Sequence, residues 1–224
     1  MITSAANPRL KLVRKLASRR QRDKLGLFVA EGEDLVDAAR VAGIEPVDLL
    51  VAGEDVEPSL LADVSTLAHA ARVVGVFRRA DLASFEQRRV ALALWHVADP
   101  GNVGTLIRTA DAFGAAVGLS AGCADPTGPK ALRASAGATF RVPIGGFDEP
   151  AGRRVALVAR AGEPLASLDH GEPAVFVLGA EREGLPDEVV AGCDAVASMP
   201  IANSAESLNV AVAGAIALYE WSRR

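Results

Sequence analysis

The chain has 224 residues, of which 50% are hydrophobic, 23% are charged and only 4% are aromatic. This length and composition allow one substantial core and a smaller second one, and they exclude a disordered chain. No apolar run approaches the roughly 18 residues of a membrane span, and the N-terminus lacks an apolar signal core, so we expect a cytoplasmic protein. Cys123 and Cys193 lack metal-ligand spacing, and we expect no metal site.

Positive charge is concentrated at the start of the chain. Residues 1–24 hold eight basic side chains and one acidic one, whereas the whole chain has a net charge of −4. The first segment therefore carries about +7, and the rest of the chain about −11. Such a segment is either a site for a polyanion or a solvated helix face, and charge alone does not decide between them.

The first 89 residues predict a small α/β unit. Asn7 and Pro8 are typical of a helix start, because Asn caps free N–H groups and Pro has none to lose. Beyond them, apolar residues form one helical stripe, and basic residues occupy much of the remaining surface. Turn signals then predict strands at 27–30, 47–51 and 73–77 and helices at 33–42 and 60–70, beginning with a β-α-β unit.

The pattern changes after the charged segment 78–89, so we place a domain boundary near residue 89. Short apolar runs alternate with polar turns and helical segments, which is typical of an α/β domain. The runs are apolar enough to be buried on both faces, as in a parallel sheet. The predicted strands are 90–97, 116–120, 155–159, 174–178 and 195–199. A final helix at 207–221 is apolar nearly all round and should be buried in the core or across a subunit interface.

Three loops of this domain contain glycine and polar side chains at the ends of predicted strands. In open parallel sheets, ligands bind beyond the carboxyl ends of the strands. The loops are residues 99–104, 179–184 and 200–209. The first lacks the third glycine of a dinucleotide fingerprint, and no P-loop lysine follows it, which argues against nicotinamide and nucleoside triphosphate cofactors.

Taken singly, the polar residues of these loops also have structural explanations. Arg108 could be a surface residue or an ion-pair partner on the helix that follows the first loop. Glu181 could be a carboxylate favoured at a helix start, and Ser207 and Asn209 could cap the last helix.

Together and in this order, the loops carry a more specific pattern. Residues 99–114 (DPGNVGTLIRTADAFG), 177–185 (VLGAEREGL), and 199–201 (MPI) with 207–213 (SLNVAVA) resemble motifs one, two and three of the SpoU-type RNA 2′-O-methyltransferases of the SPOUT superfamily. Residues 129–138 resemble the family's segment between motifs one and two, and residues 4–32 resemble the substrate-binding domain of many members. The resemblance covers nearly the whole chain.

The resemblance implies a homodimeric α/β protein with a trefoil knot in the catalytic domain, residues 90–224, and a smaller RNA-binding domain, residues 1–89. It implies S-adenosylmethionine as cofactor and a ribose 2′-hydroxyl of RNA as methyl acceptor. The additional N-terminal domain favours ribosomal over transfer RNA. By resemblance, the cofactor-binding residues are Gly179, Met199 and Leu208, with Leu178 and Ile201 beside them.

The resemblance also implies a set of catalytic residues: Asn102, Arg108, Glu181, Ser207 and Asn209. Arg108 is the family's candidate for proton removal, yet a guanidinium, with a pKa of about 12.5 or more, is effectively always protonated. We therefore expect Arg108 to bind the phosphate beside the target ribose and to stabilise the developing alkoxide, with the proton lost to solvent or to a transiently neutral Arg108.

In this context the basic segment gains a function, because an RNA methyltransferase must hold a polyanion. The predicted RNA contacts are Arg9, Lys11, Arg14, Lys15, Arg19, Arg20, Lys130 and Arg133. Such contacts position RNA without reading its sequence. Two departures from the family pattern affect loop shape and substrate choice: Asn203 and Ser204 replace a glycine-bearing turn, and Gly101 replaces a bulkier residue.

Two other functions remain open. The first is a non-catalytic RNA-binding or ribosome-assembly protein on the same scaffold, against which the intact Asn102, Arg108, Glu181 and Asn209 argue. The second is a small-molecule α/β enzyme with a nucleotide cofactor, against which the missing phosphate loop and the basic segment argue.

Overall fold

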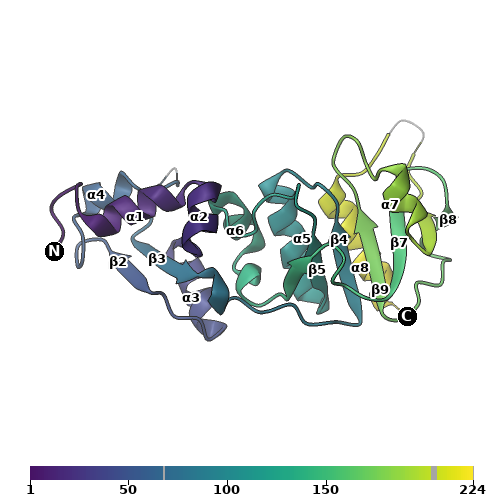
Figure 1. Cartoon of the computed structure of the whole chain (residues 1–224), viewed down its shortest axis with the longest axis horizontal. Helices are drawn as coiled ribbons and strands as arrows, with labels where there is room; N and C mark the ends of the chain where they lie inside the picture. The colour runs from purple at the N-terminus through teal and green to yellow at the C-terminus, as the bar shows by residue number, and fades with distance from the viewer. Residues whose placement is uncertain (68, 203–205, 224) are drawn as a thin grey trace.

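The computed structural model is an elongated molecule with one β-sheet toward each end (Figure 1). It describes residues 1–67, 69–202 and 206–223. The helices are α1 (Pro8–Leu16), α2 (Arg19–Leu25), α3 (Glu33–Val41), α4 (Pro58–Ala62), α5 (Pro100–Phe113), α6 (Pro129–Ser135), α7 (Asp187–Ala191) and α8 (Val210–Ser222), with 3-10 helices η1 (Arg79–Asp81) and η2 (Ala138–Phe140). The strands are β1 (Leu27–Glu31), β2 (Asp48–Val51), β3 (Val73–Arg78), β4 (Val90–Leu94), β5 (Ala116–Leu119), β6 (Ile144–Gly146), β7 (Arg153–Val158), β8 (Glu163–Pro164), β9 (Ala174–Leu178) and β10 (Ala195–Ser198).

The basic N-terminal segment forms two helices, α1 and α2, rather than the single helix that we expected. Asn7 caps α1 as predicted, since its side-chain oxygen accepts the N–H of Arg9 at 2.9 Å. The break follows α1 because Arg22 reaches back from α2 and donates hydrogen bonds to the carbonyls of Leu16 and Ala17. These carbonyls lie at the end of α1, where no further helical N–H is available to them.

The N-terminal sheet has the order β1-β3-β2, and its central strand runs antiparallel to both neighbours. The strands β1 and β2, which α3 connects in the predicted β-α-β unit, are therefore not neighbours, because β3 lies between them. The predicted helix at 60–70 is wrong, because α4 ends at Ala62. The following residues are diverted toward buried Glu31, whose carboxylate accepts hydrogen bonds from the hydroxyls of Ser65 and Thr66 at 2.6 Å each.

The C-terminal sheet has seven strands within the described residues, in the order β6-β5-β4-β9-β7-β10-β8. All of its pairings are parallel. On one face, Leu92 and Leu94 of β4 belong to the core that includes residues of α5 and α8. On the other face, Ala91 and Ala93 contact a smaller cluster that includes Val189 of α7. The predicted α/β class with a parallel sheet is confirmed, and the trefoil knot stays a prediction of the resemblance.

The five strands predicted for this domain are present, with small differences at their ends. Strands β6 and β8 were not predicted, because three and two residues are too short to give an apolar pattern. The expectation of burial on both faces holds fully for β4 and β9 at the centre, whereas β7 and β10 are only partly buried. Within the described residues, the two-residue strand β8 pairs with β10 at this edge of the sheet.

The last predicted helix is α8, which has two different sides. Among its buried residues are Ala217 and Leu218, which are inaccessible to solvent. Val212 and Tyr219 are 48% and 53% exposed, so an apolar face of the helix is left uncovered. No helix within the described part of the chain is both long and apolar enough to cross a membrane.

Buried contacts join the N-terminal elements to the C-terminal ones. The rings of Phe28 and Phe77, from the first sheet, lie with their centroids 5.9 and 5.4 Å from that of Phe140 in η2. A second contact between the two parts is the pair of Arg22 of α2 with Asp125 at 2.8 Å, in which only 5% and 8% of the two side chains are exposed. Arg79 binds the same carboxylate at 2.7 Å. We refer to Arg22, Arg79 and Asp125 as the joint cluster.

Candidate active site

The loops that follow β4, β9 and β10 meet beyond the carboxyl ends of these strands. The first loop is shaped by Asp99, the N-cap of α5, whose carboxylate accepts the N–H of Asn102 at 3.0 Å. Pro100 occupies the first helical turn, where a missing N–H costs nothing. Lys130 donates a hydrogen bond to Asp99 at 2.8 Å and holds the pKa of that carboxyl below its ordinary value.

The second loop is a tight turn between Ala180 and Gly184, whose backbone groups exchange hydrogen bonds of 3.1 and 3.0 Å. Gly184 has a φ of +69°, a conformation that favours glycine. A Cβ atom at Gly179 would lie 2.2 Å from the carbonyl carbon of Gly184, so no side chain fits there. The glycines of motif two therefore let two stretches of backbone approach closely.

The third loop leads into α8 through Asn209. This residue is the N-cap of the helix, because its side-chain oxygen accepts the N–H groups of Ala211 and Val212 at 2.8 and 3.3 Å. The capping explanation of Asn209 is thus correct, although it does not exclude a second task. Asn203 and Ser204, where the sequence departs from the family pattern, lie outside the described residues.

A hydrogen-bonded network ties the three loops together. Asn102 donates from its side-chain amide to Glu181 at 2.9 Å, and Asn209 donates to the amide oxygen of Asn102 at 3.1 Å. The backbone N–H groups of Asp99 and Ala98 also donate to Glu181, at 3.2 and 3.3 Å. Burial raises the pKa of Glu181, but these hydrogen bonds outweigh it and hold the pKa below its ordinary value. Glu181 is therefore a charged carboxylate at neutral pH.

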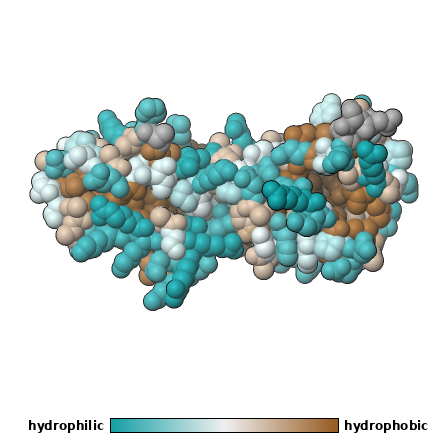
Figure 2. Space-filling view, turned by 90° about the horizontal axis from the view of Figure 1, so that it is seen from above, coloured by the Kyte–Doolittle hydropathy of each residue, from teal (hydrophilic) through white to brown (hydrophobic). Residues whose placement is uncertain are grey.

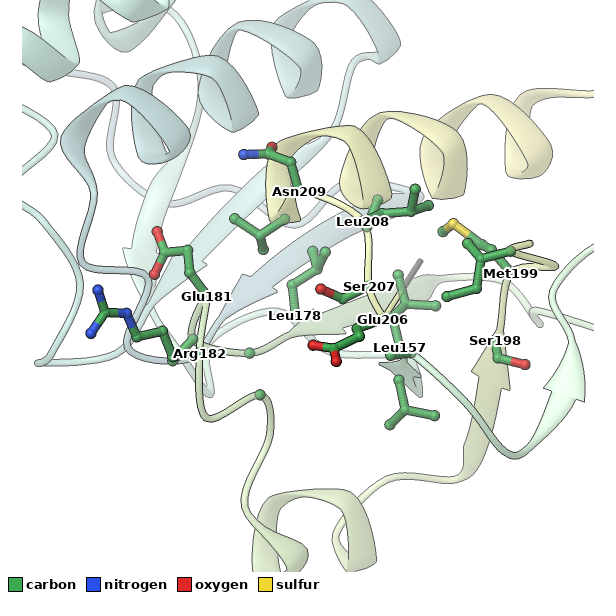
Figure 3. A pocket seen from close by; sticks show the side chains of 18 of the residues that line it. Leu157, Leu178, Glu181, Arg182, Ser198, Met199, Glu206, Ser207, Leu208 and Asn209 are labelled. Atoms are coloured by element: carbon green, nitrogen blue, oxygen red, sulfur yellow. The ribbon is translucent and has the colours of Figure 1, made fainter. Parts of the chain in front are cut away.

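Beside this network lies a pocket with a volume of about 640 Å³, a size typical of small-molecule sites. Figure 2 shows apolar surface in a hollow at the C-terminal end of the molecule, and Figure 3 shows the labelled lining side chains. All five residues predicted to bind the cofactor line the pocket, namely Leu178, Gly179, Met199, Ile201 and Leu208. Of the predicted catalytic residues, Glu181, Ser207 and Asn209 line it, and Asn102 reaches it through Glu181 and Asn209.

Sequence reasoning missed other residues of the lining. Leu157, Val158 and Ala159 enter from the end of β7, which lies next to β9 in the sheet. Strand order does not follow from a single sequence, so the position of this strand end was not predictable. Arg182, Glu183 and Glu206 also line the pocket. They stand inside or beside the recognised motifs, and their charge was the only available signal.

Arg108 lies apart from the pocket of its own chain. It is exposed on α5 and does not belong to the pocket lining. Within the described residues, no hydrogen bond or ion pair involves its guanidinium. The structure thus brings Asn102, Glu181 and Asn209 together but leaves Arg108 free to meet another molecule.

The side chains predicted to contact RNA differ in whether they already form hydrogen bonds or ion pairs within the protein. Arg9 forms an ion pair with Asp48, Arg19 donates to the carbonyl of Cys123 at 3.0 Å, and Arg133 donates to the hydroxyl of Thr66 at 3.1 Å. Arg14 donates to the carbonyl of Ala5 at 2.9 Å, and Lys130 binds Asp99, as described above. Lys11, Lys15 and Arg20 are exposed.

In the part of the chain that the structure describes, no three His, Cys, Asp or Glu side chains are grouped so that they could hold a metal ion.

Comparison with known families assigns both parts of the chain. Residues 89–219 match the SpoU rRNA Methylase family, and residues 7–82 match the MRM3-like substrate binding domain. The chain belongs to the SpoU rRNA methylase family. The family expected from the three motifs is therefore confirmed, and so is the nature of the N-terminal domain of this SpoU methylase.

Several known relatives of this SpoU methylase resemble it over nearly their whole length. The 23S rRNA (guanosine(2553)-2′-O)-methyltransferase RlmP of Bacillus subtilis is 32% identical, with 97% of each chain covered. A crystal structure of an AdoMet-bound rRNA methyltransferase from Sinorhizobium meliloti superposes with a TM-score of 0.88, at 29% identity over 99% of this chain and 97% of that one. The SpoU methyltransferase AviRb from Streptomyces viridochromogenes, in complex with AdoMet, gives 0.84 at 25% identity over 97% of each chain.

Proposed function

We propose that this SpoU methylase transfers a methyl group from S-adenosylmethionine to a ribose 2′-hydroxyl of ribosomal RNA, and that the residues of its three loops perform the reaction. The chain is an RNA 2′-O-methyltransferase that uses S-adenosylmethionine. The observation that carries the assignment of residues is the pocket, because the motif loops converge on it and the Asn102–Glu181–Asn209 network lies at its edge.

The pocket fits S-adenosylmethionine in size and chemistry. Its volume of about 640 Å³ suits a ligand of this size, and its apolar side chains, such as Leu157 and Leu178, can cover the adenosine and exclude water. The close backbone approach at Gly179 presents N–H and C=O groups for polar recognition. When bound, the cofactor supplies an electrophilic methyl group. We propose that Leu178, Gly179, Met199, Ile201 and Leu208 hold it.

The polar network orients the reacting groups. Asn102, fixed by Glu181 and Asn209, cannot turn without breaking two hydrogen bonds. Such fixed amides can hold a ribose in line with the methyl group, which lowers the entropic part of the barrier. Ser207 lines the pocket one residue before Leu208, where its hydroxyl can contact the same ligands. These residues are positioning groups in the proposal, and none of them needs to change protonation state.

Arg108 is the proposed contact to the phosphate beside the target ribose. As the 2′-oxygen loses its proton, negative charge develops on it, and a nearby guanidinium stabilises that charge. The exposed, unpaired position of Arg108 on α5 allows it to meet an incoming RNA, since no described residue competes for it. With the alkoxide stabilised in this way, the proton can pass to solvent.

The N-terminal unit, residues 1–89, is the proposed RNA-binding domain ahead of the catalytic unit, residues 90–224. Its exposed Lys11, Lys15 and Arg20 are available for phosphates, and Arg14 and Arg19 retain donors beyond those used within the protein. Arg9 and Lys130 would have to share their charge with Asp48 and Asp99, whereas Arg133 retains donors beyond the one bound to Thr66. Phosphate contacts of this kind position RNA, while unpaired bases supply selectivity.

A homodimer is part of the proposal because of the uncovered face of α8. Val212, Ala215, Ile216 and Tyr219 are three or four residues apart, so they form one apolar stripe that is at least partly exposed. Leaving such a stripe in water is unfavourable, and a second copy of the chain would bury it. Helix α5, which carries Arg108, packs tightly on α8 at Gly214. The proposed dimer interface would therefore lie near Arg108.

An rRNA substrate agrees with the activities named for the full-length relatives, and the proposal includes a cytoplasmic location. The decisive experiment incubates the purified protein with labelled S-adenosylmethionine and separated ribosomal and transfer RNAs. Nuclease digestion and mass spectrometry then locate the label. We expect one 2′-O-methylated ribose in ribosomal RNA. Methylation of a base, or of transfer RNA alone, would overturn the proposal.

A further inference from the structure

The charged side chains of the cofactor pocket are mostly acidic. Glu181, Glu183 and Glu206 line it, and Arg182 is the one basic residue in the described lining. With these groups ionised, the lining has a formal charge of −2. The substrate of an RNA methyltransferase carries one negative charge per phosphate. The three carboxylates would repel this substrate if no cation at the pocket faced the RNA.

Arg182 is placed where that cation is needed. It occupies the tight turn between Ala180 and Gly184, directly after Glu181, so the rigid turn fixes the position of its backbone. Figure 3 shows its side chain extending toward the side of the pocket where Glu181 lies, away from the apolar groups around Leu157 and Met199. The guanidinium is therefore beside the catalytic network and not within the apolar part of the cavity.

The protein itself does not use this guanidinium. Arg182 is exposed, and within the described residues no hydrogen bond or ion pair engages it. Its neighbour Glu181 accepts hydrogen bonds from Asn102 and from two backbone N–H groups, and not from Arg182. An unpaired arginine on a rigid turn has its planar donor fork available for a carboxylate or a phosphate.

We propose that Arg182 binds a phosphodiester of the RNA next to the ribose that is methylated, and that it is a substrate-binding residue distinct from Arg108. This inference rests on the proposed function. Arg108 does not line the pocket, whereas Arg182 does, so the two guanidiniums approach the RNA from different elements, α5 and the loop after β9. The guanidinium of Arg182 attracts this phosphate at the pocket mouth and offsets its repulsion by Glu181 and Glu183.

The main competing ligand is the carboxylate of the cofactor's methionine part, which the same donor fork could bind. The two possibilities differ in what a substitution changes. If Arg182 binds the phosphodiester, its removal weakens RNA binding and leaves cofactor affinity unchanged. If it binds the cofactor, its removal weakens cofactor binding in the absence of RNA.

The experiment compares the parent with Arg182→Ala, Arg182→Lys and a control, Arg40→Ala, whose exposed side chain lies on α3 and pairs with Asp37 and Glu45. Calorimetry measures S-adenosylmethionine binding. Filter binding and initial rates are measured on unmodified large-subunit ribosomal RNA transcribed in vitro. For Arg182→Ala we expect an RNA affinity about tenfold weaker than that of the parent, and a higher KM for RNA. The slope of log RNA affinity against log salt concentration should be shallower by about 0.7. Arg182→Lys should recover part of the affinity, because it keeps the charge but loses the fork.

Two results would overturn this inference: an RNA affinity of Arg182→Ala equal to that of Arg40→Ala, or a cofactor affinity at least tenfold weaker than that of the parent. The proposed function fails in a different way, through absence of methyl transfer by the parent protein itself. RNA filter binding still tests Arg182 in that case, because it needs no turnover.

Discussion

The joint cluster and the pocket mouth use the same residue types in opposite ways. At the joint, Arg22 and Asp125 are 5% and 8% exposed and lie 2.8 Å apart, and Arg79 adds a second guanidinium. At the pocket mouth Arg182 is exposed, as is Arg108 on α5 outside the pocket lining, and no described residue pairs with either guanidinium. Buried charges must be paired to be tolerated, whereas a group that binds an outside ligand must be left unpaired. Pairing therefore separates structural arginines from those available for RNA.

The largest effect on ligand binding is expected from a substitution that disturbs the pocket. In Gly179→Ala, the new Cβ would lie 2.2 Å from the carbonyl carbon of Gly184, so the motif-two turn must move. We expect S-adenosylmethionine binding to weaken more than a hundredfold, about 2.7 kcal/mol, in a calorimetric titration. The matched control is Gly192→Ala, where the nearest atom to a Cβ is 3.5 Å away. Parent-like binding by Gly179→Ala would show that the turn does not hold the cofactor.

The second prediction concerns a substitution that removes the negative charge of the joint cluster. Asp125→Asn keeps the shape of the side chain but leaves the guanidinium of Arg22 buried without a counter-charge. Removing one partner of a buried pair costs about 3–5 kcal/mol, and we expect a loss of this order in urea unfolding. Asp37→Asn, on an exposed pair, should change the free energy of unfolding by less than about 0.5 kcal/mol. A loss as small as in the control would mean that the cluster is not a stabilising feature.

The same variant has a pH signature. Burial raises the pKa of Asp125, but hydrogen bonds from Thr127 and the charges of Arg79 and Arg22 bring it below its ordinary value. A lowered pKa means that the stabilisation is complete above about pH 4 and is lost as the pH falls through the folded-state pKa. The difference in stability between parent and Asp125→Asn should therefore narrow under acid conditions and stay constant near neutrality.

The third prediction concerns Arg108. Arg108→Ala should lower the rate of methyl transfer about a hundredfold, since loss of a single group that stabilises an oxyanion has this effect in other enzymes. Cofactor binding should be unchanged, because Arg108 does not line the pocket. Arg108→Lys should retain an intermediate rate under single-turnover conditions. An alanine variant with the parent rate would remove Arg108 from the mechanism.

The smallest effect is expected at the N-terminal helices. Neutralising Arg14, Lys15 and Arg19 together should weaken RNA binding about tenfold and reduce the slope of log affinity against log salt by about 2. The control removes three exposed arginines elsewhere, Arg40, Arg72 and Arg223. Equal slopes for the two triple variants would show that the basic segment is only a solvated face. Urea unfolding should accompany this test, because Arg19 also contacts the carbonyl of Cys123.

Much of the fold could be predicted because its signals are local. The cap at Asn7, the apolar runs of β4 and β9, and the glycine of motif two each reflect neighbours in sequence. The predictions were wrong where residues distant in sequence determine the end of a helix. The helix predicted at 60–70 ends early because Glu31 attracts Ser65 and Thr66. The basic segment breaks because Arg22 binds the carbonyls at the end of α1.

The candidate site was predictable to the extent that its motifs are continuous in sequence. All five residues predicted to bind the cofactor line the pocket, and Asn102, Glu181 and Asn209 form one network. The contribution of β7 was not predictable, since it depends on which strand lies beside β9. The separation of Arg108 from the pocket, and the presence of Arg182 in it, likewise depend on how the two elements are oriented.

The sequence by itself determined the family, the α/β class, the three loops and the concentration of positive charge at the start of the chain, because each is expressed by residues close together in the chain. Only the tertiary structure decided which charges are paired. Arg22 and Arg182 are both arginines in charged segments, yet one is buried against Asp125 and the other is exposed at the pocket. The partner of a charged side chain depends on residues far away in sequence, so composition and spacing cannot reveal it.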